Sequence, residues 1–307
     1  MTDFLEECLS NFQKKLNRRP LFQTEANPPS YSDLGKQARE LFNSGYHFGL
    51  LSMNIITKSP SNVKFTTTCV ESLNRRNLFG SLEAQYDLLD SLTLTEKWNT
   101  DCTVTTELCC KNKPVKDFRL TLAGSISPRS GDKVGTVEAE WANRMCTMNS
   151  KLEMGKKFSL LTLSSVIRYR GLLGGVLAKF DTYTSKMNDM NFAAGFSSKD
   201  FILHTSFNSG SECGGSIFHK VTPKADAGVQ FIYSTNKRMD IIFGVAGRYQ
   251  ASENVCLRGK INNLSQLGLG CEQRIRECVL LSLSVLFDIR YFGEGKYKLG
   301  FSIQFES

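Results

Sequence analysis

From about Leu50 to its end, this chain alternates apolar and polar side chains with period two, which favours β-strands throughout. In the segment LLSLSVLFD (280–288), for example, serines separate leucine and valine side chains. Further segments that alternate in the same way cover 162–170, 192–197, 241–250 and 299–305. The sequence has no run of about 20 apolar residues, so it excludes a helical membrane span.

The composition of the two faces bears on whether this β structure lies in water or in a membrane. One face is bulky and apolar, and the other carries mostly Gly, Ala, Ser, Gln and charged residues. A membrane barrel turns the apolar face to lipid, whereas a soluble sandwich shows the same alternation with that face inward. Residues 50–307 contain no second domain break and fit about 18–20 tilted strands of about 9–11 residues each. This number favours an all-β transmembrane barrel, because a single soluble sandwich rarely needs so many strands.

The residues before the barrel divide at Pro28-Pro29. Residues 1–27 form an N-terminal extension with apolar residues at helical spacing. Beyond the prolines, Ser32 or Asp33 can cap a helix over 33–43, and Gly45 is suited to end it. One helix face carries Leu34, Ala38, Leu41 and Phe42, and the other carries Lys36, Arg39 and Glu40.

Charge and cysteine spacing exclude several function classes. The formal net charge is +8, but no dense Lys/Arg run occurs, so we expect no nucleic-acid partner. The ten cysteines form no CxxC pair, so no metal site is predicted, and we expect reduced thiols. The only histidines, His47, His204 and His219, belong to no catalytic motif, and neither GxGxxG nor a P-loop is present. We therefore expect neither an enzyme nor a tight nucleotide site.

Several long segments, in order, closely resemble the mitochondrial porins, the voltage-dependent anion channels. They are PPSYSDLGKQARELFNSGYHFGL (28–50), LTEKWNTD (94–101), NFAAGFSSKDFILHTSFNSGSECGGSIFHKV (191–221), YQASENVCLRGKINNLSQLGLG (249–270) and KLGFSIQF (298–305). The resemblance implies 19 strands with the first and last parallel, an odd count for which this family is the standard example. It implies a pore helix and hinge over 28–49 and a barrel over 50–307. It further implies a voltage-gated pore in the lipid bilayer of the mitochondrial outer membrane, passing ions and small anionic metabolites such as ATP and ADP.

The resemblance also assigns roles to individual residues. Lys36, Arg39 and Glu40 would line the pore, with Lys36 contacting ATP, and Glu96 would face lipid and take part in gating. Gly45, His47 and Gly49 would form the hinge, and Lys298, Gly300, Ile303 and Phe305 an outer-membrane insertion signal. No resident cofactor is implied, only weak, transient contact with ATP or NADH. The positions implied for nicotinamide-nucleotide contact are Gln266, Leu267, Gly268, Ser284, Val285, Leu286, Phe287 and Asp288.

Departures from the family pattern predict altered selectivity. His47 replaces a usual glycine and should stiffen the hinge. Family lysines are missing at several positions of the first half of the wall, including Ser52, Asp132 and Glu138. We therefore expect a porin with weakened or reversed anion preference and altered gating. The alternative is a barrel that conducts poorly and serves as an outer-membrane interaction scaffold, with 1–27 as its docking segment. A homo-oligomer and cytosolic docking proteins stay open, and a protein-import pore fits the motifs less well.

Overall fold

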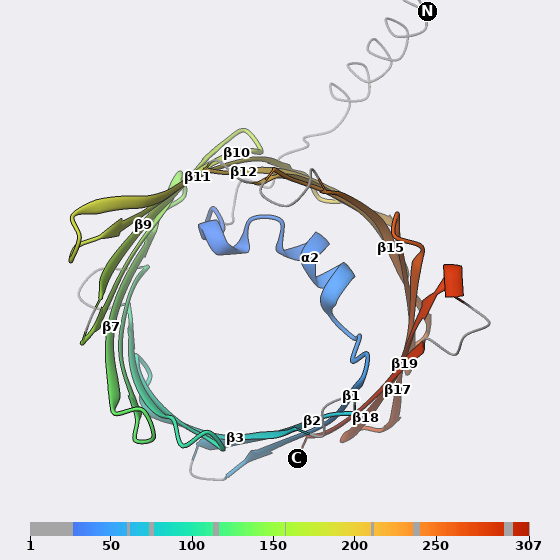
Figure 1. The fold of residues 1–307 in the computed structure, drawn as a ribbon, viewed down its shortest axis with the longest axis horizontal. Helices are drawn as coiled ribbons and strands as arrows, with labels where there is room; N and C mark the ends of the chain where they lie inside the picture. The colour runs from blue at the N-terminus through green and yellow to red at the C-terminus, as the bar shows by residue number, and fades with distance from the viewer. Residues whose placement is uncertain are drawn as a thin grey trace, which may run out of the picture.

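The computed structural model describes residues 27–59, 62–73, 77–112, 117–156, 158–209, 212–235, 240–291 and 297–306. Within these ranges nineteen strands form one closed sheet (Figure 1). Every strand is antiparallel to its chain neighbours, and β1 closes the ring by pairing in parallel with β19, with Leu51 opposite Phe301. The predicted barrel and its parallel closure are therefore confirmed. The predicted extension over 1–27 lies, up to residue 26, outside the described residues.

The first ten strands are β1 (Leu50–Lys58), β2 (Val63–Ser72), β3 (Leu78–Leu89), β4 (Leu92–Asn99), β5 (Val104–Lys111), β6 (Phe118–Ser127), β7 (Asp132–Ala142), β8 (Cys146–Gly155), β9 (Ser159–Tyr169) and β10 (Leu172–Asp181). The others are β11 (Lys186–Ser197), β12 (Phe201–Asn208), β13 (Glu212–Thr222), β14 (Ala225–Ser234), β15 (Asp240–Ser252), β16 (Val255–Asn262), β17 (Gln266–Arg276), β18 (Val279–Asp288) and β19 (Tyr297–Glu306). A short 3₁₀ helix, η2 (Ile289–Tyr291), follows β18.

The two faces of the sheet differ as the alternation predicts. On β1, Leu51, Met53 and Ile55 are exposed on the outside, whereas Ser52 between them points inward and is only 6% exposed. Large apolar side chains are exposed in the same way around the ring, for example Phe192 on β11 and Leu283 on β18. An apolar outer belt of this kind suits hydrocarbon, while the closed ring leaves no unpaired strand edge in lipid.

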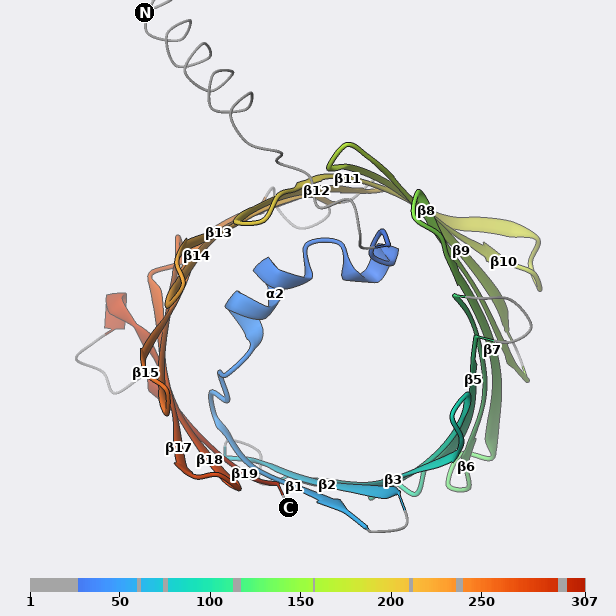
Figure 2. The ribbon, with the colours of Figure 1, turned by 180° about the vertical axis from the view of Figure 1, so that it is seen from behind.

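Residues 28–49, which we call the lumen segment, lie inside the ring (Figures 1 and 2). The segment contains a 3₁₀ helix, η1 (Tyr31–Asp33), and an α-helix, α2 (Lys36–Asn43). The predicted helix over 33–43 was wrong at its start, because Gly35 at φ +67° separates the two helices and no side chain caps α2. Among the described residues, no helix is long and apolar enough to cross a bilayer.

Candidate functional site

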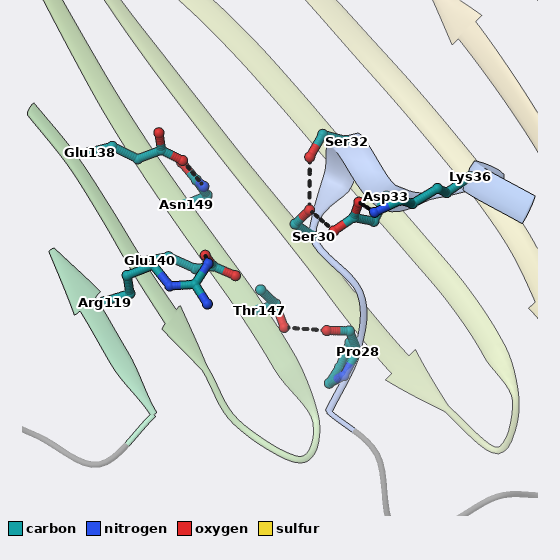
Figure 3. A network of polar contacts seen from close by, with 10 residues as sticks. All are labelled: Pro28, Ser30, Ser32, Asp33, Lys36, Arg119, Glu138, Glu140, Thr147 and Asn149. Carbon is teal, nitrogen blue, oxygen red and sulfur yellow. Dashed lines mark hydrogen bonds and ion pairs between the residues drawn. The ribbon is translucent and has the colours of Figure 1, made fainter. Parts of the chain in front are cut away.

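The lumen segment begins at a polar anchor on β8 (Figure 3). The hydroxyl of Thr147, a side chain that is 2% exposed, donates a hydrogen bond of 2.7 Å to the carbonyl oxygen of Pro28. Two residues further, Ser30 donates to Asp33 at 2.8 Å, and Lys36 pairs with the same carboxylate at 3.2 Å. Partial burial opposes ionisation of Asp33, but Ser30 and Lys36 together hold the pKa of its carboxyl below the usual value. The start of the segment is thus fixed to the wall by a buried hydrogen bond.

Two apolar contacts attach the middle of the segment. Leu34 is buried against Val166 and Leu173 and covers Gly175, where a Cβ would lie 2.9 Å from the Leu34 side chain. Farther along, Leu41 and Phe42 pack with Phe218 on β13 and Ala246 on β15. These contacts confirm that the apolar face predicted from sequence is buried, as expected for an amphipathic helix against a wall.

The opposite face of α2 is exposed to the lumen at Lys36, Arg39 and Glu40. Arg39 donates a hydrogen bond to the carbonyl oxygen of Ser32, and Lys36 already pairs with Asp33. The three side chains therefore lie where the resemblance places pore-lining residues, and two of them have partners within the segment. Their role in the passage of solutes stays a prediction.

The hinge packs closely on the wall. Gly45 and Gly49 adopt φ +78° and +73°, whereas His47 is not among the described residues with positive φ. The His47 amide donates to Ser284 Oγ at 2.9 Å, and its carbonyl oxygen lies where a Cβ on Gly300 would overlap it. Burial lowers the pKa of the His47 imidazole and raises the pKa of Tyr46 to about 12. Both side chains are therefore neutral at pH 7.

Beneath Gly45 lies an ion pair that the sequence did not reveal. Arg258 on β16 and Glu272 on β17 are 2.9 Å apart, and their side chains are only 11% and 17% exposed. A Cβ on Gly45 would overlap both side chains. Gly45 is thus required by close approach to this pair as well as by its positive φ.

The predicted nucleotide-contact residues divide between the two faces. Gly268 lies beneath the ring of Phe48, so β17 turns Gln266 and Gly268 inward and Leu267 outward. On β18, paired with β17, the inward residues are Ser284, Leu286 and Asp288, and the outward ones are Val285 and Phe287. The resemblance implies nucleotide contact at all eight positions, which requires them to face the lumen. This is wrong for Leu267, Val285 and Phe287, because strand alternation turns them to the outer face.

Two of these inward residues, Gln266 and Leu286, border a cavity of about 250 Å³. Phe42 and Phe48 of the lumen segment, Lys260 on β16, Gln266 and Leu286 are among its lining residues. Asn262 holds Gln266 through two hydrogen bonds of 3.0 Å, one to its backbone amide and one to its side chain. The cavity combines apolar rings with a few polar groups, the usual make-up of a small-molecule site.

The contacts described so far all fall on β8 to β19, which we call the covered wall; we call β2 to β7 the opposite wall. The opposite wall borders a polar cavity of about 510 Å³, to which Glu107, Arg119, Glu138 and Glu140 contribute. Arg119 pairs with Glu140 at 3.4 Å, and Asn149 on β8 donates to Glu138 at 2.8 Å (Figure 3). Acidic side chains outnumber basic ones among its inward positions, which carry Glu83, Asp87, Glu107, Asp132, Glu138 and Glu140 against Lys64, Lys97, Lys111 and Arg119.

The remaining predicted positions lie as alternation requires. On β4, Thr95 borders the polar cavity, so its neighbour Glu96 points outward, opposite Ala84 and Thr106. On β19, Gly300 points inward, and Ile303 and Phe305 point outward. Among the described residues, no group of three or more His, Cys, Asp or Glu side chains could hold a metal ion.

Sequence reasoning missed that several inward glycines of the covered wall lie against the lumen segment. Gly228, Gly244, Gly268, Gly270 and Gly300 each lie within contact distance of the lumen segment. The sequence does place these glycines on the polar face of the alternating strands. It does not indicate that the lumen segment lies against that face.

Comparisons with known proteins agree with this architecture. The model of the eukaryotic porin family matches residues 27–300. The chain is 40% identical over 281 residues to a voltage-dependent anion-selective channel of Drosophila melanogaster, covering 91% of this chain and 99% of that protein. It is 38% identical over 283 residues to the non-selective voltage-gated ion channel VDAC2 of Xenopus laevis, covering 92% of this chain and 100% of that protein.

Proposed function

Because this chain belongs to the eukaryotic porin family, whose members are channels and not enzymes, we propose that it forms a voltage-gated diffusion pore of the mitochondrial outer membrane. The solutes are ions and small metabolites such as ATP and ADP. The closed sheet, apolar outside and polar inside, carries this proposal, because such a ring surrounds a path for solutes through lipid. The cation-bearing face of α2 stands in that path and would raise the local concentration of phosphate-bearing solutes.

The proposal includes a weakened anion preference. The acidic excess on the opposite wall supports it, since fixed carboxylates attract cations and repel anions. The pairing of Lys36 with Asp33 supports it too, because a partnered ammonium attracts passing anions less. Family membership does not decide the matter: one relative is named anion-selective and another non-selective.

A weak nucleotide contact in the 250 Å³ cavity is also part of the proposal. The inward Gln266 and Leu286 border it, and Phe48 offers a ring face for a base or nicotinamide ring. Transit requires that any such contact be weak, since a solute held tightly would block the pore.

The test is reconstitution of the purified full chain into planar bilayers, with the reversal potential read across a KCl gradient. We expect voltage-dependent channels with a reversal potential closer to zero, or of cation sign, than that of the Drosophila relative measured alongside. An equally anion-selective reversal would overturn the weakened preference and leave the pore intact. No current from a folded, inserted barrel would overturn the pore and favour the scaffold.

A further inference from the structure

Lys260 on β16 makes an unusual set of contacts for a lysine that faces a pore. Its ammonium donates a hydrogen bond of 2.6 Å to the carbonyl oxygen of Phe42, in the last turn of α2. It also lies 4.3 Å from the ring centroid of Tyr46 and 5.1 Å from that of Phe48. One cation thus contacts a helix end and two aromatic faces of the hinge, and all of these contacts are made with the lumen segment.

Contacts of this kind hold a helix end and its neighbouring rings in place against the wall. The last carbonyls of a helix have no intrahelical partner, and a cation there satisfies one of them and complements the helix dipole. Cation–π contacts gain strength when the ammonium is partly desolvated, as it is between two rings and a wall. A free ammonium in a water-filled lumen would make none of these contacts.

The surroundings of Tyr46 point the same way. Its hydroxyl is buried and has no hydrogen-bond partner among the described residues. A buried hydroxyl without a partner costs stability, so the hydroxyl does not explain why an aromatic residue stands here. The ring explains it instead, because the Tyr46 ring lies near that of Phe48, with centroids 5.3 Å apart, and both rings face Lys260.

We propose that Lys260 is a positioning residue that fastens the C-terminal end of α2 and the hinge to the covered wall, and so opposes closure of the pore by voltage. The proposal rests on the channel function proposed above. An applied voltage acts on the net positive charge that Lys36, Arg39 and Glu40 together give to the free face of the same helix. Whatever holds the helix end to the wall resists that force. Because the ammonium of Lys260 already binds the lumen segment, it contributes little to the preference of the pore for anions.

The closing experiment compares Lys260→Met with Lys220→Met in planar bilayers. Lys220 is the matched control, an exposed lysine on the same wall that lies opposite Asp226 on β14. We expect Lys260→Met to close roughly tenfold faster at a fixed voltage, with little change in reversal potential. We expect Lys220→Met to shift the reversal potential toward cations and to close at the wild-type rate. The reverse pattern, or equal effects of both, would overturn the proposal.

Two further variants separate the ring contacts from the general packing of the hinge. Tyr46→Phe keeps the ring and should close at the wild-type rate, whereas Tyr46→Leu should resemble Lys260→Met. Lys260→Arg keeps a cation over the rings and should restore slow closure. If Lys260→Arg closes as fast as Lys260→Met although both barrels fold, a cation at this position does not hold the helix end in place, and the proposal is overturned. Absence of current in the wild type would instead count against the proposed pore, so the two failures can be told apart.

Discussion

The covered and opposite walls belong to one sheet but place different residues at their inward positions. The covered wall has glycines beneath the lumen segment, such as Gly228 and Gly268, together with cations that contact it. The opposite wall turns its glycines outward, including Gly124 and Gly135, and fills its inward positions with charged and polar side chains. The inner sequence of the covered wall is therefore constrained by packing, and that of the opposite wall by contact with water and solutes.

The largest expected effect concerns the buried ion pair of the covered wall. Glu272→Gln leaves Arg258 nearly buried and unpaired beneath Gly45, which should lower the free energy of unfolding by about 3 kcal/mol. Asp226→Asn is the matched control, because its partner Arg248 is 44% exposed and can be solvated when unpaired. Denaturant titration of the refolded barrel measures both. Equal losses of unfolding free energy in the two variants would mean that lumen water reaches both ion pairs to the same extent.

The next effect tests the close approach at Gly300. Gly300→Ala would force a Cβ into the carbonyl oxygen of His47, a backbone atom that cannot move away without displacing the hinge. Overpacking of this kind costs about 1–3 kcal/mol, so we expect a lower thermal midpoint and an altered conductance. Gly124→Ala is the control, since a Cβ there meets nothing within 4 Å. Refolded protein is used, because Gly300 also lies in the predicted insertion signal. A midpoint unchanged by Gly300→Ala would contradict the structure of the hinge.

A smaller gain in stability should come from the outer face of the opposite wall. Glu96 points toward lipid, where a carboxylate costs less than the roughly 2–4 kcal/mol of a basic side chain. Glu96→Gln should therefore stabilise the barrel by about 1 kcal/mol in lipid and leave the reversal potential unchanged. Glu107→Gln, on the neighbouring strand but inward, should do the opposite: shift selectivity without stabilising. A Glu96→Gln barrel that is no more stable would show that the carboxylate is already compensated.

The barrel could be predicted from the sequence because alternation over 258 residues leaves few other solutions, and the resemblance supplied the strand count and the parallel closure. The break in the helix at Gly35 could not be predicted, because it depends on how the lumen segment fits beside His204. The ring of His204 lies 2.8 Å from where a Cβ on Gly35 would stand. The outward direction of Leu267, Val285 and Phe287 could be predicted from the alternation of the strands, whereas the resemblance assigns nucleotide contact to positions on both faces. The hydrogen bond from Lys260 to the Phe42 carbonyl oxygen joins residues 218 positions apart, and no local pattern encodes it.

A pH effect should come from His47, which burial holds at a lowered pKa with only Glu272 opposing. Because the folded-state pKa lies below the unfolded value of about 6.5, stability is fully present above that pH and is lost as the pH falls toward the folded value. We expect the drop in thermal midpoint between pH 7.5 and pH 5 to be smaller in His47→Asn than in the wild type. His219→Asn, on an exposed residue of β13, should keep the wild-type drop. The same drop in His47→Asn would mean that the imidazole is solvated when charged.

The smallest expected effect tests the opposite wall itself. Replacing Glu138 and Glu140 by glutamine removes two inward carboxylates and leaves the guanidinium of Arg119 without its partner. A unit charge about 10 Å away in water acts with about 0.4 kcal/mol on each ion, and with opposite sign on anions and cations. The anion-to-cation permeability ratio should therefore rise by about fourfold per charge removed, and by less in high salt. Glu71→Gln, which removes a carboxylate from the outer face of β2, should leave the ratio unchanged. If the double variant also leaves it unchanged, ions do not pass close to the opposite wall, and selectivity is set at the lumen segment alone.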